Sequence, residues 1–285
     1  MFEGWFKLPR EARILIIYYT LSSIPIIADI YLPIYLFVLG WKLIEIGFLL
    51  SYSFIISVIG SVVFGRILDI GFQPKWAMFF IDLSATVLYI IYAFAPRPDY
   101  IYIGLSLYSF LDPLSVAYQT IEKALYPEDY YERAFSYHMA LPNASQLIGM
   151  LLSGFVLTYM VSEVSGFKLL FIACAMLMGV SCTYILVFIP RTETVHVTFS
   201  FSLSVSRNLI PIIIAELIII LGYSISPQFI YLNFVYNVAG LNLFLISITL
   251  VLANIAGVLG SYLITEKRVD LRSISIAISL LSLSY

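Results

Sequence analysis

The chain has 285 residues, of which 61% are apolar and only 11% are charged. Its mean hydropathy of +0.99 lies well above the range of soluble globular domains, whose surfaces need far more charge. The formal net charge of -2 at pH 7 leaves no basic stripe that would release counterions from a phosphate backbone, which excludes nucleic-acid binding. The composition therefore predicts a protein that lies in a membrane.

Eight apolar segments are each long enough to cross a hydrocarbon core, which needs about 20 residues of helix. In chain order they are 14–38, 44–65, 76–95, 100–121, 135–160, 168–189, 209–234 and 242–264. A ninth begins near Ser273 and reaches only Tyr285, which is about 20 Å of helix and too short to cross. We therefore expect an all-α polytopic membrane protein whose given sequence stops inside a membrane helix, as a truncated chain would.

Basic residues set the expected orientation, because positive charge favours the cytoplasmic side of a membrane protein. With the N-terminus inside the cell, only Lys42, Arg97 and Lys168 of the 15 Lys and Arg side chains fall outside, which leaves twelve inside. Loops rich in Lys and Arg alternate with loops poor in them along the whole sequence. The sequence thus predicts a multi-pass protein of the plasma membrane with a cytoplasmic N-terminus.

The longest polar stretch, Pro190 to Arg207, follows the sixth predicted span. We interpret it as a central cytoplasmic loop over residues 191–207, although it is also compatible with an ordinary loop. It separates a six-helix bundle over residues 1–190 from the start of a second bundle over residues 208–285. That second part would hold two helices and a partial third.

Four acidic residues fall inside the predicted spans, where a charged side chain costs roughly 2.5–3.5 kcal/mol at the helix centre. They are Asp29, Asp82, Asp112 and Glu216. No Lys or Arg lies deep in any predicted span. Asp82 is expected to pair with Arg66 or Lys75 near the end of its helix. The other three are candidates for solute binding or for reversible protonation.

Each of these three candidates has a structural alternative. Asp29 lies about 22 Å along its helix and between two prolines that disturb the helix, and it would otherwise bond to a neighbouring helix. Glu216 lies about 10 Å from the cytoplasmic side, where a snorkelling acid is the alternative. Asp112 forms a stripe at positions i, i+4, i+7 and i+11, which predicts one polar helix face, with interhelical bonding as the alternative. The stripe consists of Tyr108, Asp112, Ser115 and Gln119.

The fifth predicted span carries a second stripe of polar and small side chains, for which helix packing is the favoured interpretation. Its members are Asn143, Gln146, Gly149 and Ser153. His138 stands near the inner end of the same span, and we expect an interfacial histidine there.

The segment GRILDIGFQPK at Gly65–Lys75 connects the second and third predicted spans. Its Gly65 and Asp69, four residues apart, resemble the loop between spans two and three of the major facilitator superfamily of secondary transporters. Ile70 stands where the family usually has a basic residue, and Gly71 comes one position early. The resemblance implies a loop that controls the conformational change, in which Gly65 permits close helix approach and Asp69 latches the two halves. An interfacial turn with a solvated acid is the alternative. The residues of this expected loop are Gly65, Arg66, Asp69, Gly71 and Lys75.

A second resemblance lies at the entry to the fifth span, where Arg133-Ala134 match the family's proline–acidic–Arg-Ala pattern. We add Arg133 to the expected conformational loop residues on this ground. The fourth-span arginine of drug/proton antiporters is absent, and Gly104 stands near its place. In this family spans one, four, seven and ten line the central cavity, and the first three of these are the spans that carry Asp29, Asp112 and Glu216.

The leading hypothesis is a permease that moves a small solute by alternating access, with proton coupling through Asp29, Asp112 or both as a further hypothesis. The alternatives are a membrane-embedded enzyme and a truncated membrane protein that does not transport. The sequence has no HExxH motif, no paired Asp motif and no Gly-x-Ser-Gly with a partner histidine. We therefore expect no catalytic residues, no metal and no cofactor. The expected partners are membrane lipid, a small-molecule solute and protons.

Overall fold

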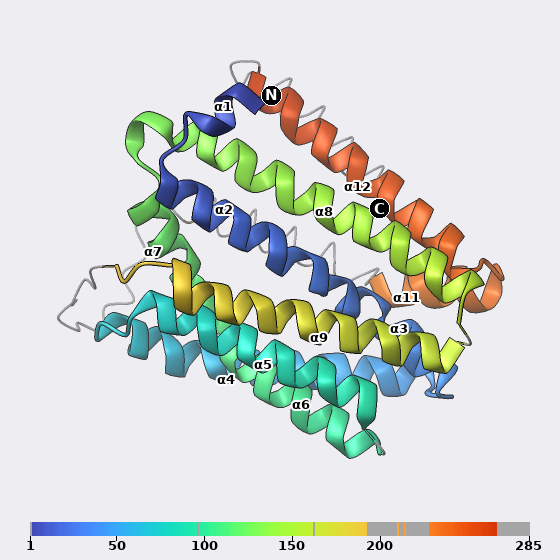
Figure 1. Ribbon diagram of the computed structural model, residues 1–285. Helices are drawn as coiled ribbons and strands as arrows, with labels where there is room; N and C mark the ends of the chain where they lie inside the picture. The colour runs from blue at the N-terminus through green and yellow to red at the C-terminus, as the bar shows by residue number, and fades with distance from the viewer. Residues whose placement is uncertain are drawn as a thin grey trace.

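A computed structural model of the chain describes residues 2–95, 97–161, 163–192, 210, 214 and 228–266. Within these ranges every regular element is a helix, and the long helices lie side by side in one bundle (Figure 1). Five described segments are long and apolar enough to cross a membrane, judged by length and composition. The all-α polytopic fold predicted from the sequence is confirmed. The five segments are Arg10–Val38, Leu43–Asp69, Pro74–Phe94, Glu128–Tyr159 and Val164–Phe188.

The first crossing follows the short helix α1 (Phe2–Phe6) and is built from three consecutive pieces. They are α2 (Arg10–Ser23), the 3-10 turn η1 (Ile24–Ile26) and α3 (Ile27–Val38). Pro25 lies within η1, and Pro33 lies inside α3. Because proline cannot donate an intrahelical hydrogen bond, a tightened turn at Pro25 is the expected local response. It lies just before Asp29 in the chain.

The second and third crossings, α4 (Leu43–Asp69) and α5 (Pro74–Phe94), are joined by a tight turn. Gly71 adopts a φ of +91°, a left-handed conformation that side chains with a Cβ rarely take. Its N–H donates to the carbonyl of Leu68 at 3.0 Å, and the next N–H, from Phe72, donates to Ile67 at 3.3 Å. This pair of bonds is the Schellman arrangement that ends a helix.

The fourth crossing is interrupted where the sequence predicts a regular helix. It runs through α6 (Pro98–Leu111), the 3-10 segment η2 (Asp112–Ser115) and α7 (Val116–Leu125). Pro113 stands at the start of η2 and removes a donor from the helical ladder. The described helix also continues beyond the predicted end at residue 121. The turn η3 (Glu128–Tyr130) then leads into the next crossing.

The remaining described helices are α8 (Tyr131–Tyr159), α9 (Glu163–Phe188), α11 (Gln228–Asn233), the π-helical η5 (Phe234–Val238) and α12 (Leu243–Glu266). Most of the predicted seventh span and nearly all of the predicted loop 191–207 lie outside the described residues. The partial helix predicted from Ser273 lies wholly outside them. We refer to the end of the bundle at which α2 begins as the Arg10 end, and to the end at which α3 finishes as the Val38 end.

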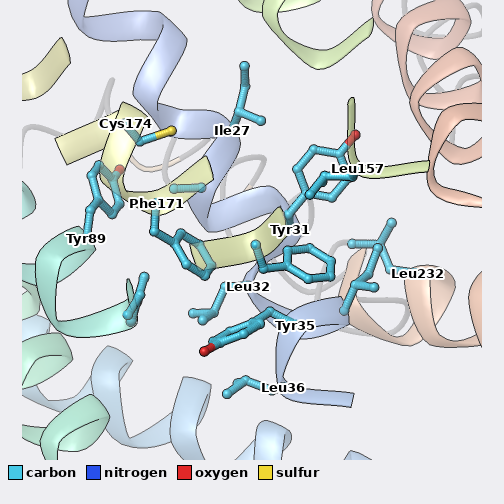
Figure 2. Packing of buried hydrophobic residues seen from close by; sticks show 14 of the residues in the cluster. Ile27, Tyr31, Leu32, Tyr35, Leu36, Tyr89, Leu157, Phe171, Cys174 and Leu232 are labelled. Atoms are coloured by element: carbon cyan, nitrogen blue, oxygen red, sulfur yellow. The ribbon is translucent and has the colours of Figure 1, made fainter. Parts of the chain in front are cut away.

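The helices of the first six crossings pack closely: α5 runs along α9, α6 contacts both α4 and α5, and α2 contacts α8 and α9. α12 packs along the other side of α8 (Figure 1). An aromatic core fills the space between α3, α5 and α9, and Figure 2 shows Tyr35 of α3 beside Phe171 of α9. The ring centroids of Tyr35 and Phe171 lie 5.0 Å apart in an edge-to-face arrangement.

One face of α4 carries large apolar side chains that no described residue covers. Phe48, Phe54 and Val62 are each more than 60% exposed. A contiguous apolar face of this size is unfavourable in water and is the surface that a lipid-facing helix presents. The polar side chains of the bundle gather instead around a cavity inside it.

Candidate functional site

A cavity of about 330 Å³ lies between α2, α5, α8 and the rod formed by α6, η2 and α7. Counted along the first crossing at about 1.5 Å per residue, the wall begins roughly 10 Å from the Arg10 end and finishes roughly 25 Å from it. The wall is polar and aromatic in a chain that is otherwise apolar. Its tyrosines and acids are Tyr18, Tyr19, Tyr108, Tyr118, Asp82 and Asp112.

Three of the four residues of the predicted fourth-span stripe meet in this wall: Tyr108, Asp112 and Ser115. The hydroxyl of Tyr108 interacts with the carboxylate of Asp112 one helical turn away. Gln119 belongs to a different hollow near the Arg10 end, beside Glu122. The helix changes from α to 3-10 at η2, so the number of residues per turn changes between Asp112 and Gln119.

Asp82 also lines the cavity, although the sequence indicated a structural ion pair. It is only 2% exposed, and both of its carboxylate oxygens lie 3.1 Å from the hydroxyl of Tyr18. The hydroxyl of Tyr118 donates to the same carboxylate at 3.5 Å. Lys75 instead donates to the carbonyl oxygen of Leu186 at 3.0 Å, so the expected pairing of Asp82 with Lys75 is wrong.

Asp29 lies outside the wall of the cavity. The hydroxyl of Tyr89 on α5 donates to its carboxylate at 2.9 Å. Asp29 and Asp112 are close enough for their charges to interact. The hydroxyl of Tyr92 is buried and has no hydrogen-bond partner among the residues described. The structure therefore brings Asp29 near Asp112, and Tyr108 of the cavity wall is close enough to interact with both acids. Glu216, the third candidate acid, lies outside the described residues.

His138 takes part in the wall of the cavity, where the sequence indicated a plain interfacial histidine. Its ring stacks on Tyr19 with centroids 4.1 Å apart, and its Nδ1 lies 3.1 Å from the hydroxyl of Tyr126. Glu122 accepts a 2.7 Å hydrogen bond from Tyr19 and lies 3.7 Å from the same His138 nitrogen. These groups connect the first, fourth and fifth crossings on the side of the cavity nearer the Arg10 end.

The polar stripe of α8 has two functions, although the sequence favoured packing alone. Asn143 and Gln146 line the cavity. Gly149 serves packing, because a Cβ there would lie 2.5 Å from the side chain of Ile27. The hydroxyl of Ser153 donates within its own helix to Met150.

The residues of the expected conformational loop lie at the Arg10 end, where Gly65 packs closely against none of the described helices. A Cβ at Gly65 would meet no described atom within 4 Å, and the role expected of this glycine stays a prediction. Close approach occurs one turn earlier, at Gly60, where a Cβ would collide with the backbone of Phe110 on α6. Asp69 is exposed at the end of α4, and Arg133 lies in the first turn of α8.

Among the described residues, no group of three His, Cys, Asp or Glu side chains is placed to hold a metal ion. The two cysteines, Cys174 and Cys182, are buried as free thiols in α9. The chemistry that the cavity offers is that of carboxylates, phenols, serine hydroxyls, amides and one imidazole.

Comparison with solved structures shows the fold of a transporter. The chain resembles a POT family transporter in complex with a thioalcohol-conjugated peptide, at a TM-score of 0.54 and 17% identity. It resembles a POT family transporter with 5-aminolevulinic acid (0.53, 17%) and a peptide transporter POT with sulfate (0.54, 13%). The matches cover 93%, 91% and 96% of this chain but only 55%, 54% and 56% of those chains. The chain thus spans little more than half the length of these proteins.

Comparison with curated protein sequences gives no match. The model of one protein family, described as the Major Facilitator Superfamily, matches residues 14–285 and so nearly the whole sequence. This match agrees with the resemblance of Gly65–Asp69 and Arg133-Ala134 and with the bundle of antiparallel crossings. The chain belongs to the Major Facilitator Superfamily.

Proposed function

We propose that the protein is a permease that moves a small solute across the plasma membrane by alternating access. The observation that carries the proposal is the polar and aromatic cavity between α2, α5, α8 and the fourth crossing of an apolar bundle. In a membrane protein, ionisable side chains around such a cavity mark a solute or ion pathway. The N-terminal bundle of residues 1–190 would be one of the two moving bodies, with the N-terminus in the cytoplasm. The second body would begin near residue 208.

The contact between α8 and α12 supports this division, because it joins the two proposed bodies along small side chains. Ser247 of α12 faces Gly154 of α8, where a Cβ would lie 2.8 Å from the Cβ of Ser247. The amide N–H of Phe244 donates to the hydroxyl of Thr158 at 2.9 Å. Interfaces of small residues permit close helix packing in membranes. An alternating-access cycle requires that such a contact can rearrange.

Proton coupling is the finer part of the proposal. Asp29 and Asp112 are acids that neighbour tyrosines, and the bonded neighbour of Asp29 is a neutral phenol. A carboxyl group with neutral partners can take up or release a proton without breaking an ion pair. We propose Asp29 as the coupling acid, because it lies outside the wall of the solute cavity, and Asp112 as an acid that faces the solute.

The test is transport by the purified chain in liposomes that enclose a pH-sensitive dye. An imposed pH gradient and members of four solute classes are supplied: organic amines, amino acids, dipeptides and carboxylic acids. We expect one class to move protons and to accumulate only with the gradient. The Asp112→Asn variant should lose most of this flux, whereas Asp129→Asn, at an exposed turn, should retain it. Solute uptake that ignores the gradient would remove proton coupling, and flux unchanged in Asp112→Asn would remove the cavity assignment.

A further inference from the structure

We propose that the cavity binds a small organic cation through an ammonium group, held by Asp112 and Asp82 and surrounded by tyrosine rings. The proposal rests on the proposed function and names the class of solute that this site would take. It follows from three properties of the wall: its charge, the placement of its aromatic rings and its size.

The charge of the wall is one-sided. Its two acids, Asp82 and Asp112, stand on different crossings. The imidazole of His138, beside Glu122, is the one basic side chain among the described residues that line the cavity, and no Lys or Arg lines it. The described hydrogen-bond partners of the Asp82 carboxylate are the neutral phenols of Tyr18 and Tyr118. An anionic solute would be repelled here, because two carboxylates would face it inside a low dielectric. A single positive charge is the complement that this wall lacks.

The rings of three wall tyrosines form a continuous group beside Asp82. The centroid of Tyr18 lies 5.3 Å from that of Tyr19 and 6.3 Å from that of Tyr118, and Tyr19 and Tyr118 are 5.8 Å apart. A cation within about 6 Å of a tyrosine centroid is attracted by the face of the ring. Spacings of this size allow one ammonium or methylated ammonium group to contact more than one ring. Groups of aromatic rings around a cation are how proteins bind organic ammonium ions.

The aromatic lining favours an organic ion over an inorganic one. Potassium, sodium and divalent ions need several oxygen ligands around one centre. Among the residues that the structure describes, no three His, Cys, Asp or Glu side chains are grouped to hold an inorganic cation. The cavity volume of about 330 Å³ lies at the lower end of the range for small-ligand sites, roughly 300–1,000 Å³. The fitting solute is therefore a small monocation rather than a peptide.

The test is equilibrium binding to the chain in lipid nanodiscs, with labelled tetramethylammonium as the probe. We expect saturable binding that choline displaces, whereas equal concentrations of potassium chloride, sodium benzoate and the uncharged tert-butanol do not. Asp112→Asn should weaken binding at least tenfold. Tyr118→Phe, which keeps the ring, should remain within about threefold of the parent, while Tyr118→Ala should lose at least tenfold. The matched control Asp129→Asn should bind as the parent does.

Several outcomes would overturn the proposal: no saturable binding, equal displacement by potassium or benzoate, or unchanged binding in Asp112→Asn. If Asp112→Asn does not yield a monodisperse protein, the comparison of Tyr118→Phe with Tyr118→Ala decides instead. The assay needs no gradient and no transport. Cation binding without solute flux would therefore support this site and contradict the proposed function. Flux of another solute class without cation binding would overturn the cation site alone.

Discussion

The hydroxyl of Tyr89 on α5 lies 2.9 Å from the carboxylate of Asp29 on α3 and joins the third crossing to the first. Tyr89 belongs to the aromatic core and is 1% exposed, so its ring is held in place by packing (Figure 2). The bond thus fixes one oxygen of an acid whose charge also interacts with Asp112. Because the donor is a neutral phenol, Asp29 could take up or release a proton while the hydrogen bond keeps its side chain in place.

The Asp29→Asn variant should separate solute binding from proton movement. Asparagine offers Tyr89 a carbonyl oxygen in place of the carboxylate oxygen, but it cannot take up or release a proton. We expect solute affinity within about threefold of the parent and a loss of solute-driven proton flux in liposomes. Gradient-driven accumulation that persists in Asp29→Asn would exclude this residue as the coupling acid.

The two tyrosines that hold Asp82 should contribute unequally to stability. Tyr18 contacts both carboxylate oxygens at 3.1 Å, whereas Tyr118 lies 3.5 Å from one of them, which is a long hydrogen bond. Removing a donor to a buried charged acceptor costs about 1–3 kcal/mol. We expect Tyr18→Phe to lower the thermal midpoint in detergent clearly more than Tyr118→Phe does. The reverse order would show that the longer bond carries the larger share.

The third prediction concerns the contact between α8 and α12, where small residues let the two helices pack closely. At Gly154, a leucine would enter space held by Ser247 and by the carbonyl oxygen of Leu243, which would lie 2.9 Å from the new Cβ. Ser247 also bonds to the hydroxyl of Tyr31. We expect Gly154→Leu to abolish transport because the two helices must separate. The matched control is Gly179→Ala in α9, where a Cβ meets nothing described within 4 Å and function should be kept.

The crossings themselves were predictable from the sequence, because lipid requires long apolar runs that satisfy their own backbone hydrogen bonds. The described helices reproduce the predicted segments, with ends that shift by several residues where a cap or a proline decides the boundary. The stripe Tyr108–Asp112–Ser115 also emerged from spacing alone. Each of these features depends on residues close together in the chain.

The partners of buried polar groups were not predictable in the same way. The bond from Tyr18 to Asp82 joins residues that are 64 positions apart, and nothing in a single sequence specifies that approach. Because the chain has 22 tyrosines, the sequence alone could not indicate which few of them line the cavity. The close packing at Gly60 was not predicted either, because the crossing point of α4 with α6 depends on tertiary structure.

Substitutions at Gly65, inside α4, and at Gly71, in the α4–α5 turn, should have opposite effects on stability. Alanine at Gly71 would have to adopt a φ of +91°, which costs roughly 1–2 kcal/mol for a residue with a Cβ. Alanine at Gly65 lies within a helix in open space and gains up to about 1 kcal/mol of helix propensity. We expect a lower thermal midpoint for Gly71→Ala and an equal or higher one for Gly65→Ala. A loss of transport in a stable Gly65→Ala protein would reveal a contact made in another conformation.

The proposed orientation can be measured with single introduced cysteines and a maleimide that does not cross membranes. Lys42 and Asp129 are both exposed and stand in connections at opposite ends of the bundle. The native Cys174 and Cys182 are buried in α9, so they should remain unlabelled in the folded protein. Because positive charge is retained in the cytoplasm, Lys42→Cys should react in intact cells, and Asp129→Cys only after the membrane is opened. The opposite pattern would invert the topology, and with it the side of the membrane to which the Arg10 end and the loop at Asp69 are assigned.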